Sequence, residues 1–270
     1  MPADMSPPLD DDRSILAITG ADRIDFLQNL VTNSVTGAPG LIYAALLSPQ
    51  GKYLSDFFLK VESDRVLLDA PAAAAPDLLR RLTLYKLRAD VQIAEAGLHL
   101  HRGLATAPED TPADTPEDAL PDPRDPGMGW RAYRPTAQTG DGTDWDALRV
   151  RHAIPAHGVE LRPDDSFILE MGFERLGGVD FRKGCYVGQE VTARMKHKTE
   201  LRKGLARVTL DGPARPGDEI LTAGDGPARS VGYLGTVAGG QALAYLRFDR
   251  AQGPMVAGEA QVTLESPQGG

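Results

Sequence analysis

From about residue 204 to residue 265 the chain consists of short apolar, alternating runs separated by Gly and Pro turns. Alternation with a period of two places successive side chains on opposite faces of a strand. Several short strands at such spacing are typical of a small antiparallel barrel. The runs cover residues 205–210, 219–222, 231–237, 242–248 and 260–265. We therefore predict a C-terminal β-barrel over residues 204–266.

The preceding part of the chain mixes strand and helix patterns, which indicates an α+β fold. Helical periodicity runs from Asp22, at an N-cap position, to Val31, and recurs near residues 76–84 and 144–152. The turn Ser48-Pro49-Gln50-Gly51 predicts a hairpin between two of the strand-like runs. The runs that predict strands are residues 14–19, 41–47, 53–61, 65–68, 91–93, 98–100 and 129–133.

Residues 105–126 interrupt this pattern with six prolines and seven acidic residues against one arginine. A stretch so polar and rich in proline predicts a solvated loop. The loop supplies most of the chain's net charge of −9. An acidic balance argues against a general nucleic-acid coat, which needs a basic surface.

Cys185 is the only cysteine, so the chain alone forms neither an intrachain disulfide nor a Cys₄ cluster. A single thiol is typical of a reducing compartment. The first twelve residues are acidic and lack the apolar stretch of a signal peptide, and no apolar run approaches the length that spans a bilayer. From these observations we expect a cytoplasmic protein without membrane contact.

Cys185 lies in the segment with the most unusual composition, residues 177–190, which leads into a predicted helix at 191–195. Glycines flank the thiol, and Arg182 and Lys183 precede it. Nearby cations and a helix N-terminus favour a thiolate. Residues 181–204 hold seven Lys or Arg against two Glu, which suits an anionic ligand or an acidic partner. The alternative interpretation is a small packing cysteine beside a solvated charged face.

The run Lys183-Gly184-Cys185-Tyr186-Val187-Gly188-Gln189-Glu190 resembles the K-G-C-[YF]-x-G-Q-E signature of the YgfZ family, folate-binding relatives of glycine-cleavage T-protein. The resemblance extends over nearly the whole chain, and Thr192-Ala193-Arg194 is similar to the branch that includes mitochondrial iron–sulfur assembly factors. Further similar segments are residues 26–33, 43–56, 84–88, 122–124, 129–131, 154–155 and 169–170. The chain departs from the family pattern at Ser34, usually aspartate, and at residues 171–172 and 198–200.

This resemblance implies a T-protein-like fold in which residues 8–203 form two interlocking subdomains around a central channel, followed by the barrel. It implies binding of tetrahydrofolate or a derivative, and partners that are iron–sulfur client or assembly proteins, with an indirect effect on tRNA modification. Cys185 is then the functional thiol. The implied folate-binding and loop-shaping residues are Tyr43, Asp56, Glu170, Lys183, Gln189, Glu190 and Arg194.

Two other functions stay open at this point. An aminomethyltransferase-like enzyme of one-carbon metabolism would use a carboxylate such as Asp56 near the folate N5 atom. Direct RNA binding is disfavoured, because the basic stretch lacks the interleaved aromatic residues that stack on single-stranded bases. The accessory role in iron–sulfur protein assembly, without turnover, is the preferred hypothesis.

Overall fold

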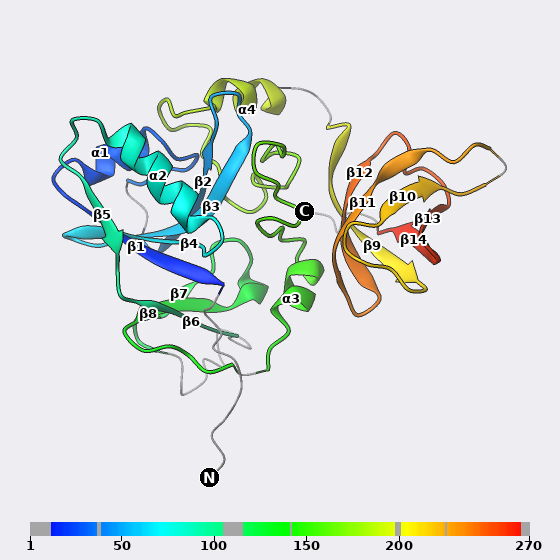
Figure 1. Cartoon of the computed structure of the whole chain (residues 1–270), viewed down its shortest axis with the longest axis horizontal. Coiled ribbons are helices and arrows are strands. Elements are labelled where there is room, and N and C mark those ends of the chain that lie inside the picture. The colour runs from blue at the N-terminus through cyan, green and yellow to red at the C-terminus, as the bar shows by residue number, and fades with distance from the viewer. Residues whose placement is uncertain are drawn as a thin grey trace, which may run out of the picture. The chain divides into compact units, whose positions relative to one another are not determined.

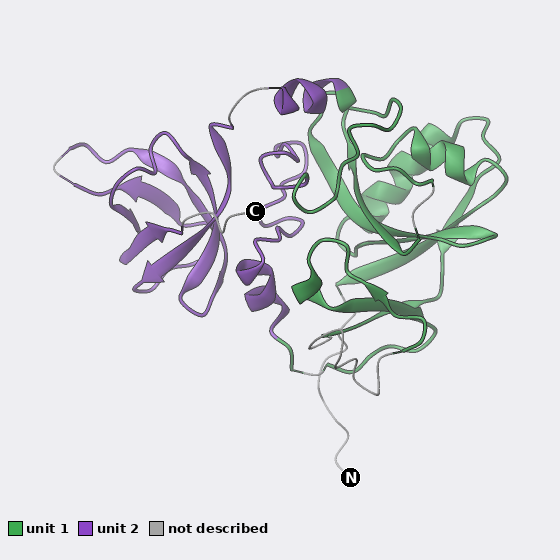
Figure 2. Cartoon of the chain, turned by 180° about the vertical axis from the view of Figure 1, so that it is seen from behind, with its two compact units in different colours: residues 1–143, 174–189 green, residues 144–173, 190–270 purple. Residues whose placement is uncertain are grey.

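The computed structural model describes residues 12–36, 39–104, 116–140, 142–197, 201–224 and 226–265. By contact density the chain divides into two compact units, each built from two separate stretches (Figure 2). Unit 1 comprises residues 1–143 and 174–189, and unit 2 comprises residues 144–173 and 190–270. The boundary predicted near residue 203 marks a change in the sequence pattern, whereas these units are defined by contacts. The predicted boundary therefore stays a prediction.

Unit 1 is built on a five-stranded antiparallel sheet with the strand order β2-β3-β4-β1-β5 (Figure 1). The predicted hairpin is present with the expected bounds, since β2 and β3 pair from Leu41↔Lys60 to Leu47↔Tyr53. Both of its strands are almost entirely buried, so both faces of the sheet are covered. The strands are β1 (Arg13–Thr19), β2 (Leu41–Leu47), β3 (Tyr53–Val61), β4 (Arg65–Pro71) and β5 (Gln92–Glu95).

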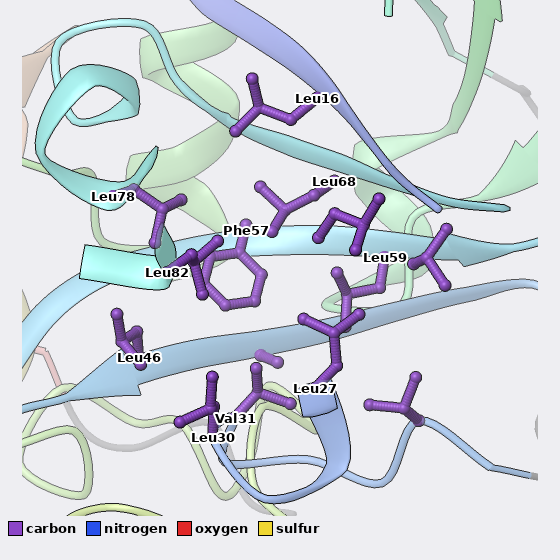
Figure 3. Packing of buried hydrophobic residues seen from close by; sticks show 14 of the residues in the cluster. Leu16, Leu27, Leu30, Val31, Leu46, Phe57, Leu59, Leu68, Leu78 and Leu82 are labelled. Atoms are coloured by element: carbon purple, nitrogen blue, oxygen red, sulfur yellow. The ribbon is translucent and has the colours of Figure 1, made fainter. Parts of the chain in front are cut away.

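One face of this sheet forms the apolar core with helices α1 (Arg23–Gln28) and α2 (Ala75–Lys86). Figure 3 shows Leu78 and Leu82 of α2 near the ring of Phe57. The predicted helix at 22–31 ends early, at Gln28, because Val31 forms an isolated bridge with Leu46. Asp22 is the N-cap residue, but its carboxylate accepts from the Asp90 N–H instead of capping α1.

The other face of the sheet carries polar side chains that contact a small three-stranded sheet, in the order β6-β8-β7. Its strands are β6 (His99–Gly103), β7 (Leu120–Pro121) and β8 (Trp130–Arg134), with a 3₁₀ turn, η1, at Pro126–Met128. The segment expected to be a solvated loop thus contains β7 and the start of η1, and Asp122 within it is buried. Residues 105–115 of that loop lie outside the described residues.

Unit 2 contains the predicted barrel, a closed antiparallel sheet with the strand order β10-β11-β12-β9-β14-β13 (Figure 1). Val208, Leu234 and Leu246 are among the residues that fill its interior. Met255–Ala257 was missed in the sequence because three residues are too few to show alternation. The strands are β9 (Lys203–Asp211), β10 (Glu219–Thr222), β11 (Ser230–Ala238), β12 (Gln241–Arg247), β13 (Met255–Ala257) and β14 (Ala260–Leu264).

Two helices precede the barrel in the sequence, α3 (Trp145–Arg151) and α4 (Gln189–Lys196). Both belong to unit 2, except that the first residue of α4, Gln189, is the last residue of unit 1. Glu160 fastens the segment after α3 to the barrel. It is fully buried and accepts from the Ala156 N–H at 2.8 Å and from the Thr236 hydroxyl at 2.7 Å. None of the helices in the described part of the chain is long and apolar enough to cross a membrane.

Candidate functional site: an exposed thiol on a fastened loop

Cys185 lies exposed in an irregular segment between Lys183 and the first residue of α4, Gln189. The side chain of the next residue, Tyr186, is buried and anchors the backbone beside the thiol. The alternative of a packing cysteine is not what the structure shows, since a packing cysteine is buried. An exposed single thiol is available to a reagent, a ligand or a partner.

The chain that leads to the thiol is fastened to the turn after α1 by backbone and side-chain hydrogen bonds. The Thr32 hydroxyl donates to the Gly178 carbonyl at 2.7 Å, and the Asp180 N–H donates to the Thr32 carbonyl at 3.1 Å. The Asn33 amide donates to the carbonyls of Gly177 and Tyr43, at 2.7 and 2.9 Å. Segments about 145 positions apart in the sequence are therefore joined at this point.

Lys183 completes this fastening from inside the loop. Its Nζ donates to the Val31 carbonyl at 2.6 Å and to the Asn33 carbonyl at 2.8 Å. Burial lowers the pKa of this ammonium to about 8, although Asp180 acts in the opposite direction. The family resemblance implies a folate-binding and loop-shaping lysine, and the contacts in the structure are those of a residue that holds the loop.

The two glycines around Cys185 differ in what surrounds them. Gly188 has φ +82°, and a Cβ there would lie 2.6 Å from the Ser48 carbonyl oxygen and 2.9 Å from the Leu47 Cβ. The hairpin turn therefore requires glycine at 188. A Cβ on Gly184 would meet nothing within 4 Å. The fold needs one of these glycines and leaves open space at the other, next to the thiol.

A groove of about 720 Å³ lies in unit 1 along residues 177–182, the segment that leads to the thiol. We call it the loop groove. Phe181 contributes an aromatic side chain to its lining, while Ser34, Asp180 and Arg182 contribute polar groups. Its volume is in the range of pockets that hold small organic ligands. Ser34, one of the departures from the family pattern, is thus placed at this groove, where its hydroxyl lies 3.2 Å from that of Thr36.

Asp56 and Tyr43 form a buried polar cluster on the face of the five-stranded sheet away from α1 and α2. The carboxylate of Asp56 accepts from the Tyr43 hydroxyl at 3.0 Å and from the Tyr53 hydroxyl at 2.6 Å. Burial first, and then the charge of Asp56, raise the pKa of both tyrosines well above the ordinary value. The structure thus brings together Tyr43 and Asp56, two of the residues implied to bind folate, and the carboxylate accepts from both phenols.

Next to this cluster is a group of ionised residues that are not among the predicted site residues. Asp69 is fully buried and accepts from Arg131 at 2.6 Å, Arg13 at 2.7 Å and the Tyr133 hydroxyl at 3.1 Å. The two guanidinium groups outweigh burial and lower the pKa of Asp69 to about 2. Asp122 pairs with Arg124 at 2.8 Å.

The ring of Phe58 is the point where these cations meet. The guanidinium carbon of Arg131 lies 4.1 Å from the ring centroid, that of Arg124 4.7 Å and that of Arg13 5.7 Å. Cations over an aromatic face are attracted by its quadrupole. Two segments of the sequence, 122–124 and 129–131, could have pointed to this cluster, because both resemble the family pattern. Neither segment indicates a role by itself.

The remaining predicted residues lie at or after the start of α4, or in unit 2. Gln189 is the first residue of α4 and is half-buried, whereas Glu190 and Arg194 are exposed on that helix. Glu170 belongs to unit 2, where its carboxylate accepts from the Tyr245 hydroxyl at 2.7 Å. Among the described residues no three His, Cys, Asp or Glu side chains are grouped as a metal site would require.

Comparison with solved structures defines the class of the fold. The chain is similar to the glycine cleavage system aminomethyltransferase T from Bartonella henselae, with a TM-score of 0.68 over 94% of this chain and 83% of that one, at 14% identity. Residues 202–269 match the family model described as CAF17, C-terminal beta-barrel domain. The chain therefore has an aminomethyltransferase T-like fold that ends in a barrel of the CAF17 type, as the sequence predicts.

Curated relatives then identify the family. The iron-sulfur cluster assembly factor IBA57 of Mus musculus is 30% identical over 91% of this chain and 78% of its own, and that of Homo sapiens is 30% identical with the same coverage. The homologue of Mycosarcoma maydis is 31% identical, but this chain spans only 55% of its length. The chain belongs to the IBA57 family of iron-sulfur cluster assembly factors.

The relatives also correct one expectation. We expected a cytoplasmic protein, but the names of these relatives include the word mitochondrial and point to mitochondria instead. The expectation was wrong because a single cysteine indicates only a reducing environment, which more than one compartment provides. Composition does not carry a targeting address, since such addresses are separate segments.

Proposed function

We propose that this protein is an accessory factor in the assembly or repair of iron–sulfur proteins and that Cys185 is its working thiol. The observation that carries this proposal is the presentation of Cys185. The thiol is exposed, while Lys183 before it and Gly188 after it are held against the turn at 31–34 and the hairpin turn. A thiol fixed in this way meets a partner with little conformational entropy left to lose.

One cysteine does not complete the coordination of an iron–sulfur cluster, since such clusters are held by several thiolates. In the proposed role Cys185 therefore acts together with ligands from an iron–sulfur client or assembly protein, either on the cluster or on a ligand of the client. The cluster is cargo in this role. The family membership supports it, because the curated relatives are named as iron-sulfur cluster assembly factors.

We further propose that the protein binds tetrahydrofolate or a derivative. The loop groove suits such a ligand, since it combines the apolar and aromatic side chains of Val179 and Phe181 with polar groups at Ser34 and Asp180. Asp180 would accept hydrogen bonds from ring and amino N–H groups of a pterin, and Arg182, 97% exposed at its side chain, would attract a glutamate carboxylate. Bound folate would supply one-carbon chemistry, and the proposed assembly role does not depend on that chemistry.

The test is complementation of cells that lack this protein, with the activity of a [4Fe–4S] enzyme as the readout. Wild type and Cys185→Ala are compared at equal abundance, with Cys185→Ser as a sterically matched variant. We expect rescue by wild type alone. Equal rescue by all three proteins would reject the role of the thiol, and an unimpaired deletion strain without a redundant factor would reject the assembly role.

The second candidate is an aminomethyltransferase-like enzyme, and the fold neighbour favours it. In that case Asp56 is the decisive residue rather than Cys185. The two tyrosine hydroxyls that occupy its carboxylate count against a freely available proton acceptor. Loss of function in Asp56→Asn with retained folding, together with full function in Cys185→Ala, would establish the enzyme in place of the assembly factor.

A further inference from the structure

A second groove, of about 380 Å³, lies on the barrel of unit 2; we call it the barrel groove. Its charged and aromatic lining consists of Lys203, Glu219, Tyr233, Tyr245, Arg247 and Arg250. Strand register explains how these residues come together. Glu219 pairs with Tyr233, Tyr233 with Tyr245, and Arg247 with Lys203, across four neighbouring strands.

The cations of the barrel groove are placed at a cost to the fold. Lys203 and Arg247 stand directly opposite each other on β9 and β12. Like charges in that position destabilise a sheet. Arg250 adds a third positive charge and is held by a bond from its Nη1 to the Ser230 carbonyl at 2.8 Å. The barrel gains no stability from this pair of charges, so the fold does not account for their placement.

Internal compensation of this charge is weak. Within the described part of the chain, the carboxylate paired with Arg247 is Asp249, at 3.4 Å with both side chains substantially exposed. The Nε of Arg247 is buried and has no hydrogen-bond partner among the described residues. Lys203 makes no ion pair with any described residue. An outside acceptor would therefore bind the ammonium of Lys203 and the accessible part of the Arg247 guanidinium, whose side chain is 39% exposed, rather than this buried Nε.

Tyr233 and Tyr245 pack against each other in the barrel groove and contact neighbouring polar side chains. The Tyr245 hydroxyl donates to Glu170 at 2.7 Å, the Arg162 guanidinium lies 3.7 Å from the centroid of Tyr233, and the two rings are 5.4 Å apart with a tilt of 35°. One face of Tyr233 is thus covered by Arg162, and the rings pack against each other. Such rings are poor platforms for stacked bases, so single-stranded nucleic acid is disfavoured.

We propose that the barrel groove docks an acidic peptide segment of a partner protein. Carboxylates suit the forked donors of Arg247 and Arg250. Glu219 also lines the groove, three strands from Lys203 in the strand order, and would accept from a backbone or side-chain N–H of the same segment. This surface is separate from the thiol proposed above, and its failure would leave that role intact.

The experiment measures binding of fluorescein-labelled peptides to the full chain by anisotropy, at low and physiological salt. The probes are a short glutamate-rich peptide, its glutamine counterpart and a single-stranded oligonucleotide of equal charge. We expect the glutamate peptide to bind and the other two to bind weakly or not at all. Lys203→Gln and Arg247→Gln should each weaken binding about three- to tenfold.

Arg215→Gln is the matched control, since Arg215 is an exposed barrel cation outside the groove, and it should change the affinity less than about twofold. Equal affinity for the glutamate and glutamine peptides, or an equal loss in Arg215→Gln, would overturn the proposal. Tighter binding of the oligonucleotide with loss in the same variants would assign the groove to nucleic acid instead. Circular dichroism of each variant excludes loss of folding as the cause.

Discussion

Two regions of this molecule use charged and aromatic residues in opposite ways. On the polar face of the five-stranded sheet, Asp69 and Asp122 pair with three arginines over Phe58; the two carboxylates and Arg131 are buried, and Arg13 and Arg124 are mostly so. On the barrel, Lys203 and Arg247 face each other, and no buried carboxylate pairs with either of them among the residues that the structure describes. The first arrangement holds the fold of unit 1 together, and the second makes cationic groups available to something else.

The most severe test of this comparison is Asp69→Asn. The substitution leaves Arg13 and Arg131 with a buried positive charge that lacks its carboxylate. Removing one partner of a buried pair costs about 3–5 kcal/mol, so we expect the free energy of unfolding in urea to fall by that amount. The exposed Asp249→Asn should leave the unfolding midpoint unchanged. Equal effects of the two substitutions would contradict the distinction between the regions.

The same carboxylate predicts an acid limb of stability. The pKa of Asp69 is about 2 in the folded protein, below the ordinary 3.8. A lowered folded pKa means that the stabilisation is complete above pH 3.8 and is lost as the pH falls towards 2. In Asp69→Asn this part of the stability curve should be shallower, with the remaining slope coming from other carboxyls of lowered pKa such as Asp122. A wild-type curve of the same shape as that of the variant would exclude Asp69 as its source.

A smaller effect separates the two glycines that flank the thiol. Gly188→Ala forces a Cβ against the Ser48 carbonyl at φ +82°, and we expect a loss of about 1–3 kcal/mol in unfolding free energy. Gly184→Ala places its Cβ in open space and should change stability by less than about 0.5 kcal/mol. The rate of Cys185 alkylation by iodoacetamide reports whether each variant keeps the thiol accessible.

Lys183 adds a cation that is compensated by carbonyls rather than by a carboxylate. Its folded pKa of about 8 lies below the ordinary 10.5, so between these values the unfolded chain binds more protons and this group's contribution to stability rises with pH. Lys183→Met loses two hydrogen bonds, and we expect a loss on the order of 1 kcal/mol near pH 8 that grows towards pH 10. Urea unfolding at both pH values checks this. Parallel pH profiles of the two proteins would be the contrary result.

How far the sequence predicted the molecule depends on how local each feature is. The hairpin of β2 and β3 was predicted with its bounds, because its apolar runs and its turn are contiguous. The barrel was predicted from alternation, and only the three-residue β13 was too short to recognise. The early end of α1 was missed because the contact that draws Val31 away lies on β2, fifteen positions along the chain.

The candidate site divides in the same way. Cys185 and its glycines are adjacent in sequence, so a motif of eight residues predicted them together. The cluster around Phe58 was missed, because Asp69 and Arg131 meet only when two separate sheets pack. Lys183 was predicted as part of the site, but its bonds to the turn at 31–34 depend on a contact across about 150 positions. Patterns within one segment were predictable, and pairings between distant segments were not.

The smallest expected effect is the one that most sharpens the comparison. If the cations of the barrel groove repel each other across β9 and β12, Lys203→Gln should raise the stability of the chain, by a few tenths of a kcal/mol. Most surface substitutions are neutral or destabilising, so even a small gain is diagnostic. Differential unfolding of wild type, Lys203→Gln and Arg215→Gln in the same buffer measures it. The gain should shrink as salt is added, because screening weakens the repulsion in the wild type. A loss of stability in Lys203→Gln, or a gain that is insensitive to salt, would contradict this prediction. Either result would mean that repulsion between Lys203 and Arg247 does not destabilise the barrel.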